Sequence, residues 1–328
     1  MNTDVLIVGG GLAGLALAMQ LQRAGRDYLL VEARARLGGR ILSLRSQGGD
    51  DPAARYDLGP AWYWPGQPKM ARLVSALGLA VFEQYAEGKL VFQDRDGAIQ
   101  RDLDFATMAG SLRITGGITS LIDKLAQGIP AHRMRLRAKV VKLALAADGV
   151  GATLVTESGA VQIQSNKAVL ALPPRLAAAS ITFAPDPGSA ALHTMRTIPT
   201  WMAGHAKIIA VYEQPFWRAA GLSGDGISHR GPLAEVHDAS PASGSEGALF
   251  GFVAEKKPPD ADGEHNGQEA ELKADRAEDF AGLRVHAERL GKVAGQSKGK
   301  NSAFFAMGER RKRGDAERGL GSLHHLRA

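Results

Sequence analysis

The chain has 328 residues, of which 45% are hydrophobic, so it is long enough to bury the core of one large domain or of two interleaved domains. Its net charge of +6 is modest, and no basic stripe is interleaved with aromatic residues, which argues against a nucleic-acid partner. The absence of cysteine excludes disulfides and thiolate catalysis, and no Cys/His spacing or HExxH pattern indicates a metal.

A short apolar run over residues 4–8 leads directly into the glycine-rich segment 9–14. An amphipathic stretch then continues to Ala24, and a second apolar run, 28–31, ends on Glu32. Strand, glycine turn, helix, strand and acid in this order are typical of a dinucleotide-binding unit, in which the acid accepts hydrogen bonds from ribose hydroxyls.

The start of the chain also bears on its location. The first strand begins by residue 4, which leaves no room for a signal peptide. No stretch of about 18 apolar residues is free of charge, so we expect no membrane span. The expected compartment is therefore the cytoplasm.

The spacing of the first glycines predicts their separate roles. Gly9 permits a tight turn, Gly11 permits close approach of the backbone to a pyrophosphate, and Gly14 permits packing of the helix on the strand. Leu12 and Ala13 lie between them at the helix N-terminus, where free N–H groups and the positive dipole end face phosphates.

A second loop follows the acid. Ala33 and Arg34 lead to Gly38, Gly39 and Arg40. The glycine pair allows another close backbone approach, and the arginine offers a planar fork to phosphate oxygens. A nicotinamide dehydrogenase needs no such second phosphate loop directly after its ribose acid.

These two stretches, DVLIVGGGLAGLALA and LLVEARARLGGR, resemble the N-terminus of the flavin amine oxidase superfamily. Its members include monoamine, polyamine and L-amino-acid oxidases, with protoporphyrinogen oxidase and phytoene desaturases as relatives. The resemblance implies FAD, and without cysteine the cysteinyl-flavin link of some monoamine oxidases is excluded, so we expect FAD to be held non-covalently. The cofactor-binding residues it implies here are Gly9, Gly11, Leu12, Ala13, Gly14, Glu32, Ala33, Arg34, Gly38, Gly39 and Arg40.

Two further segments match the family. Gly59, Pro60, Ala61 and Trp62 match a D-x-G-a-x-W-like segment that runs past the flavin ring, although proline replaces a more usual small residue. Taken without the resemblance, the aromatic residues of this segment favour a place in the core. Val140, in a strand predicted over 139–143, matches the valine whose backbone holds the adenine.

The middle of the chain predicts ordinary architecture. The apolar spacing of Ile118, Leu121, Ile122 and Leu125 after the glycine pair 116–117 predicts a helix that packs on one face. Segments 151–157 and 161–164 are predicted to form a hairpin, and a buried strand is predicted over 168–172.

Lys207 is the catalytic candidate. On a strand it shares a face with Ile209 and Val211, and a lysine on an apolar face is unusual unless it is paired or functional. The plain alternative is a strand-end lysine that reaches out to water. The family places a lysine at the spacing K-x-x-x-x-Y-x-x-P-F-W, where it holds a water beside flavin N5, and this resemblance favours the functional interpretation.

The chain changes character after Val253. Residues 254–328 hold 28 of the 74 charged residues and contain no Ile, Trp or Tyr. The closing F-A-G-x-E segment of the family is not found there. We therefore expect an atypical polar tail, disordered or read out of frame, and a resemblance restricted to residues 1–253.

The predicted fold is α/β, with a Rossmann-type FAD-binding domain (1–70 and 114–185) interleaved with a smaller α+β substrate domain (71–113 and 186–253). The resemblance implies hydride transfer from a C–H next to an amine to flavin N5. Oxygen is the expected acceptor, and the products are an imine and hydrogen peroxide. Two alternatives stay open: a protoporphyrinogen-oxidase-like or phytoene-desaturase-like FAD enzyme, and a catalytically incomplete FAD-binding fragment.

Overall fold

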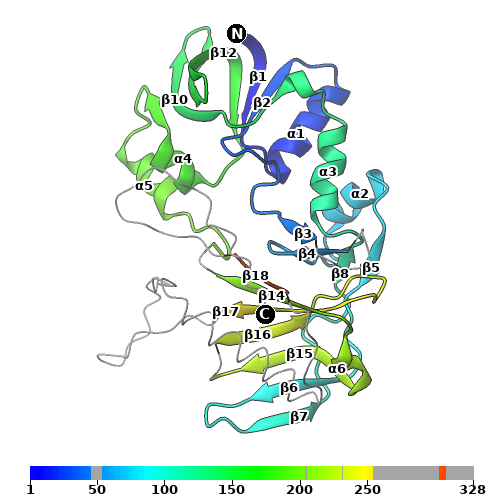
Figure 1. Ribbon diagram of the computed structural model, residues 1–328. Coiled ribbons are helices and arrows are strands. Elements are labelled where there is room, and N and C mark those ends of the chain that lie inside the picture. The colour runs from blue at the N-terminus through cyan, green and yellow to red at the C-terminus, as the bar shows by residue number, and fades with distance from the viewer. Residues whose placement is uncertain (46–53, 204, 231, 254–302, 308–328) are drawn as a thin grey trace, which may run out of the picture. The chain divides into compact units, whose positions relative to one another are not determined.

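The computed structural model describes residues 1–45, 54–203, 205–230, 232–253 and 303–307 (Figure 1). The chain folds into two compact units. Unit 1 comprises Met1–Leu42, Val74–Leu79 and Ile118–Trp201, and unit 2 comprises Ser43–Leu73, Ala80–Gly117 and Met202–Ala328.

Unit 1 is built on a seven-stranded sheet in the order β13-β10-β11-β12-β1-β2-β9. The central strand β1 is parallel to both β2 and β12, whereas β10, β11 and β12 form an antiparallel meander. The predicted strand-turn-helix-strand start is confirmed by this arrangement. The strands are β1 (Asn2–Val8), β2 (Tyr28–Val31), β9 (Met134–Arg135), β10 (Lys139–Ala146), β11 (Gly149–Thr156), β12 (Gly159–Leu170) and β13 (Thr182–Ala184).

Helices α1 and α3 of unit 1 each bury an apolar stripe. In α3, the buried residues are Leu121, Ile122 and Leu125, as their spacing predicts. The helices and the one 3-10 turn are α1 (Leu12–Arg23), α3 (Thr119–Gln127), η1 (Ala131–Arg133), α4 (Pro174–Ser180) and α5 (Ser189–Thr197); α2 (Pro68–Ala76) contains residues of both units.

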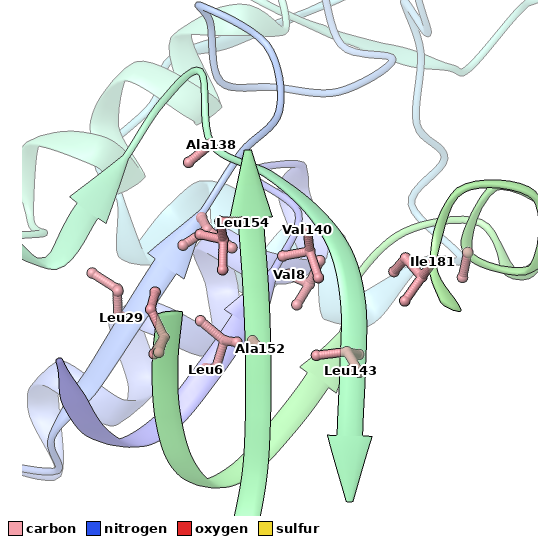
Figure 2. Packing of buried hydrophobic residues seen from close by; sticks show 12 residues of the cluster. Leu6, Val8, Leu29, Ala138, Val140, Leu143, Ala152, Leu154 and Ile181 are labelled. Carbon is pink, nitrogen blue, oxygen red and sulfur yellow. The ribbon is translucent and has the colours of Figure 1, made fainter. Parts of the chain in front are cut away.

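The core of unit 1 lies where the parallel and antiparallel parts of the sheet meet (Figure 2). Leu6 and Leu29 come from β1 and β2, and Leu143 and Leu154 come from β10 and β11. All four side chains are at most 7% exposed. Their burial supplies the main stabilisation of the frame on which the first glycine turn sits.

Unit 2 is built on a second seven-stranded sheet in the order β18-β14-β17-β16-β15-β6-β7. Two small antiparallel pairs, β3–β4 and β5–β8, accompany it. The elements are β3 (Ser43–Arg45), β4 (Arg55–Asp57), β5 (Val81–Glu83), β6 (Lys89–Gln93), β7 (Ile99–Leu103), β8 (Leu112–Ile114), β14 (Lys207–Tyr212), α6 (Phe216–Ala219), β15 (Leu222–Ser228), β16 (Leu233–Asp238), β17 (Gly247–Val253) and β18 (Ala303–Met307).

The two faces of this second sheet differ in character. Ile208, Leu233 and Val236 form an aliphatic cluster on one face. Residues that lie directly opposite each other on antiparallel strands share a face, and Phe250 pairs with both Ile209 and His237. The second face therefore carries aromatic and polar side chains, and the candidate catalytic lysine lies on it.

The division into units differs from the predicted domains. Residues 43–70, expected in the FAD-binding domain, belong to unit 2, and 186–201 belong to unit 1. The reason lies in long-range partners, since Tyr56 donates a hydrogen bond to Glu246, and Tyr63 and Leu112 exchange backbone hydrogen bonds. Within unit 1, the two strands expected over 161–164 and 168–172 are one continuous strand, β12.

Most of the tail predicted to be atypical lies outside the described residues. Five of its residues, Ala303–Met307, form β18, which pairs antiparallel with β14. The structure differs from the expectation of an unstructured tail at these residues. Their sequence, AFFAM, is an apolar run within the charged segment and suits a strand.

Candidate functional site

The first glycine turn of unit 1 has no room for side chains. Gly9 has φ of +116°, and a Cβ atom there would lie 2.6 Å from the carbonyl oxygen of Ala171. A Cβ atom on Gly14 would lie 2.0 Å from the carbonyl oxygen of Gly9. The start of α1 therefore packs directly on the end of β1, which is the arrangement that the glycine spacing predicts.

The two glycine loops lie side by side. The Gly38 N–H donates to the carbonyl of Gly10 at 2.8 Å, and Gly11 forms a parallel bridge with Gly38. A Cβ atom built on Gly39 would lie 3.4 Å from the Cα atom of Gly11. Segments 9–14 and 38–40, which the sequence treats as two motifs, thus form one backbone-lined surface.

The N-terminus of α1 opens onto this surface. Gly11 is the N-cap residue, and among the described residues no side chain caps the helix and no acidic residue occupies its first turn. The first-turn N–H groups, including those of Leu12 and Ala13, lack intrahelical partners by the geometry of any helix start. The positive end of the helix dipole is therefore available to an anion.

Glu32 is held in a fixed orientation at the end of β2. Its two carboxylate oxygens accept hydrogen bonds from the Gly10 N–H at 2.7 Å and the Arg34 N–H at 2.9 Å. The residue is half-buried, and Ala33 beside it is exposed. Each carboxylate oxygen keeps further acceptor capacity, which suits hydroxyl groups of a ribose.

Two arginines of the second loop make different contacts. Arg40, expected to bind phosphates, is exposed and donates through Nη1 to the carbonyl of Trp201 at 2.7 Å. Arg36, which the sequence reasoning missed, is half-buried and donates to the carbonyls of Leu37, Gly39 and Ile41. Arg36 therefore holds the shape of the loop. The sequence feature that could have identified Arg36 is the pair of alternating arginines at positions 34 and 36.

Val140 contributes its side chain to the core of unit 1 (Figure 2). It is 5% exposed, and its backbone pairs with Leu154 just before an irregularity in the β10–β11 ladder. The side chain of Val140 is therefore part of the core, and the resemblance implies a role for its backbone only.

In unit 2, Lys207 begins β14 and is 5% exposed. Its Nζ donates to the carbonyl of Gly59 at 3.1 Å and lies 3.8 Å from the ring centre of Phe250. The rings of Trp62 and Phe252 are 5.7 and 5.9 Å away. The lysine is therefore enclosed by aromatic side chains, so the alternative that it reaches out to water is wrong.

This enclosure changes the acidity of Lys207. Burial lowers its pKa from 10.5 to about 7, with the nearby Arg113 acting in the same direction and Asp57 acting against them. Near neutral pH the amine therefore exists in both its charged and its neutral form. An amine of this kind can hold a water molecule by either donating or accepting a hydrogen bond.

The segment 59–62 supplies one side of this enclosure. Gly59 offers its carbonyl to Lys207, Pro60 is exposed and Ala61 is buried. The Trp62 indole donates to the side chain of Gln84 at 2.7 Å and is half-buried. Trp62 therefore has a fixed orientation and an accessible part.

Sequence reasoning missed a buried polar group on the same face of the sheet. His237 is 1% exposed, and its Nδ1 lies 3.0 Å from Asp225 and 3.1 Å from the hydroxyl of Thr107. Burial by itself would raise the pKa of Asp225, but hydrogen bonds from His237 and Thr107 hold it below its ordinary value. No local signal identifies the group, because its members are far apart in the sequence.

Two kinds of feature have no counterpart in the described part of the chain. No helix there is long and apolar enough to cross a membrane. Within the same residues no group of three or more His, Asp or Glu side chains is arranged to hold a metal ion.

Comparison with known proteins adds two family matches. A model described as flavin containing amine oxidoreductase matches residues 91–265, more than half of the chain. A model described as NAD(P)-binding Rossmann-like domain matches residues 7–77.

Individual relatives agree with these matches. Putrescine oxidase of Kocuria rosea is 25% identical, with 78% of this chain and 74% of that protein aligned. The flavin-containing amine oxidase B of Homo sapiens is 40% identical over 81 residues, 24% of this chain and 15% of that protein. Among solved structures, cyclohexylamine oxidase from Brevibacterium oxydans IH-35A has a TM-score of 0.73 at 17% identity, covering 94% of this chain and 84% of its own, and shares the fold.

Proposed function

Because this chain belongs to the flavin containing amine oxidoreductase family, we propose that it oxidises an amine to an imine with oxygen as the electron acceptor. It is an FAD-dependent oxidoreductase of the amine-oxidase type. When bound, FAD supplies the acceptor for a hydride that leaves the carbon next to the nitrogen, and oxygen then takes up the two electrons to give hydrogen peroxide. Water hydrolyses the imine after release.

The residues of unit 1 fit the dinucleotide. Segments 9–14 and 38–40 form a backbone-lined surface from which any Cβ at Gly9 or Gly14 would be excluded. The uncapped start of α1 suits a pyrophosphate, and the fixed carboxylate of Glu32 suits a ribose. We assign Leu12, Ala13, Ala33, Arg34, Gly38, Gly39 and the backbone of Val140 to the same cofactor, and Arg40 as a further phosphate ligand.

Lys207 carries the proposal for the chemical step. It is a buried amine with a pKa of about 7, enclosed by Trp62, Phe250 and Phe252. In its neutral form Lys207 is able to accept a hydrogen bond from a water and in its charged form to donate one. We assign it to positioning that water beside the reacting flavin atom, and Gly59, Pro60, Ala61 and Trp62 to the wall of the same site.

The test replaces Lys207 with methionine, which keeps most of the side-chain volume and removes the amine. We expect FAD binding to survive, while amine oxidation, flavin reoxidation or both slow at least tenfold, or about 1.4 kcal/mol. The inflection near pH 7 in the affected rate should also disappear. Lys142→Met, on an exposed lysine of β10, is the matched control and should keep wild-type rates. Unchanged rates in Lys207→Met would refute the assignment.

A separate test addresses the cofactor. Acid precipitation of the purified protein should release all yellow colour into the supernatant as FAD, because the chain has no cysteine to form a cysteinyl link. Colour that remains in the pellet would contradict non-covalent binding. Turnover of a panel of amines with release of peroxide separates this proposal from a desaturase-like or porphyrinogen-oxidase-like activity.

A further inference from the structure

Gln84 is a buried amide of unit 2 that has no part in the proposed chemical step. It follows β5 and is 4% exposed. Its backbone N–H donates to the carbonyl of Ser111, just before β8, at 2.9 Å. The pairing of β5 with β8 therefore fixes the point from which the side-chain amide projects.

The hydrogen bonds of Gln84 admit only one orientation of its amide. Its Oε1 accepts from the indole N–H of Trp62 at 2.7 Å. Its Nε2 donates to the carbonyls of Tyr85 at 3.1 Å and Asp238 at 2.8 Å. An indole nitrogen is only a donor and a carbonyl is only an acceptor, so a flipped amide would lose all three bonds. The partners of Gln84 therefore determine where its oxygen lies.

One end of this connection is anchored inside unit 2. Asp238 is 0% exposed, and its carboxylate accepts hydrogen bonds from Trp217 at 2.9 Å and from Arg218 at 3.0 Å. The backbone carbonyl of the same residue accepts from Gln84. Hydrogen bonds to a buried charge are among the strong ones, so Asp238 is a fixed point from which Gln84 reaches Trp62.

The other end of the connection is the aromatic wall around Lys207. The Trp62 ring lies 5.7 Å from Lys207 Nζ. Its other ring contacts are with Phe250, at 4.9 Å and 50°, and with His237, at 5.3 Å and 82°. Ring contacts of this kind occur over a range of angles, whereas a hydrogen bond weakens steeply as it bends. The bond to Gln84 is therefore the contact that fixes the direction of the indole.

We propose that Gln84 is a positioning residue: it holds the Trp62 indole beside the Lys207 amine and so keeps that amine enclosed. The inference rests on the proposed amine oxidation, in which Lys207 holds a water, and it adds a residue that acts through Trp62. Without Gln84 the indole N–H loses its acceptor, and the ring is able to turn away and admit water to the lysine. Burial lowers the pKa of Lys207, so admitted water raises this pKa toward its ordinary value.

The charges around Lys207 are the same with and without Gln84. Titratable groups that influence the lysine or share its face of the sheet include Asp57 of β4, Arg113 of β8, Asp225 of β15, and Glu235 and His237 of β16. Glutamine and methionine are both uncharged, so Gln84→Met adds and removes no charge. A change in the acidity of Lys207 in that variant therefore reports its contact with water.

The experiment measures two pH profiles on the FAD-loaded protein. The first is the rate of oxidation of the best substrate among n-butylamine, benzylamine and cyclohexylamine, and Gln84→Met should move its inflection up from pH 7 by about one pH unit. The second is the free energy of unfolding, whose rise between pH 7 and pH 9 should shrink by about one third or more. Trp62→Phe breaks the same bond from its other end and should move both profiles in the same direction.

Two further variants separate positioning from a loss of stability. Val236→Ala, in the aliphatic cluster on the opposite face of the sheet, lowers stability without touching Trp62 and should leave the inflection near pH 7. In the Trp62→Phe background, Gln84→Met should add no further shift, because the bond through which it acts is already absent. A shift in Val236→Ala as large as that in Gln84→Met, or an undiminished effect of Gln84→Met in the Trp62→Phe background, would overturn the proposal.

The two profiles also distinguish this inference from the proposed function. A reduced rise of the unfolding free energy in Gln84→Met, in a protein that oxidises no amine, would support the link from Gln84 to Lys207 and refute the proposed function. Amine oxidation with wild-type profiles in both Gln84→Met and Trp62→Phe would refute the positioning role alone.

Discussion

The candidate sites of the two units consist of different chemical groups. In unit 1 the candidate ligand surface is backbone, shaped by glycines that leave no room for side chains and by N–H groups at a helix start. In unit 2 the candidate site consists of buried charged and aromatic side chains on neighbouring strands. The first kind of site tolerates almost no added volume, whereas the second depends on the charge and protonation of a few groups. Four tests address this contrast, from the largest expected effect to the smallest.

Gly14→Val should have the largest effect, because its first added carbon would lie 2.0 Å from the carbonyl oxygen of Gly9. We expect a loss of about 3 kcal/mol in the stability of unit 1, with loss of FAD retention. Denaturant unfolding and the FAD content of the purified protein measure the two effects. Gly151→Ala, where the new carbon would make only ordinary contact with Gln164, is the control. A Gly14→Val protein that is stable and retains FAD would show that this glycine turn tolerates added volume, which contradicts the prediction.

Asp238→Asn tests whether charge, rather than volume, sustains unit 2. The fully buried carboxylate accepts hydrogen bonds from Trp217, Arg218 and the Ser240 N–H, and asparagine has nearly the same shape. We expect a loss of about 2 kcal/mol in unfolding free energy, the scale of a hydrogen bond to a charged group. Asp104→Asn removes an exposed ion pair with Lys89 and should be nearly neutral. If both variants lose the same unfolding free energy, the buried charge of Asp238 stabilises unit 2 no more than an exposed ion pair does.

Lys207→Met tests how a buried charge in unit 2 makes the stability of the protein depend on pH. The pKa of Lys207 is about 7 in the folded protein against an ordinary 10.5, so the unfolded chain binds more protons between these values. Stability of the wild type should therefore rise with pH from about 7 toward 10.5, while below pH 7 the full cost of burying the charge applies. The stability of Lys207→Met relative to wild type should accordingly fall by about 2 kcal/mol from pH 7 to pH 9. A difference independent of pH would contradict the buried, titrating lysine.

Arg36→Ala and Arg40→Ala compare two arginines of one loop. Arg36 donates to three loop carbonyls, whereas Arg40 donates to the carbonyl of Trp201. Loss of Arg36 should loosen residues 37–41 and weaken FAD by about 1 kcal/mol, or roughly fivefold in Kd, through lost hydrogen bonds. If phosphate binding by Arg40 dominates instead, titration of the FAD-free protein will show the larger loss for Arg40→Ala.

The same contrast explains how much of the molecule the sequence predicts. The glycine turn, α1, β2 and Glu32 lie within 32 consecutive residues, and their spacing alone specifies the local geometry. Lys207 is predictable because an amine on the apolar face of a strand is unusual and because the resemblance places a lysine at this spacing. Neither the length of β12 nor the pairing of the two glycine loops is visible in that way, because both depend on tertiary partners.

The polar group of unit 2 lay beyond local reasoning altogether. Thr107 and His237 are 130 residues apart, and Tyr56 and Glu246 are 190 residues apart. Aspartate and histidine within a strand are ordinary surface residues by pattern, and only the assembled sheet buries them. The difference between the predicted domain and unit 2 at residues 43–70 has the same origin, since Tyr56 and Gly59 contact partners late in the chain.

The pairing of β18 with β14 has a consequence for handling the protein. Residues 303–307 cover one side of the strand that begins with Lys207, and β17 covers the other. A chain cut after residue 253 would leave β14 as an open edge with unpaired backbone N–H and C=O groups. The side chains along this edge, Ile208–Val211, are all apolar. Such an edge is a template for strands of other molecules. Removing the charged tail would therefore favour self-association through β14.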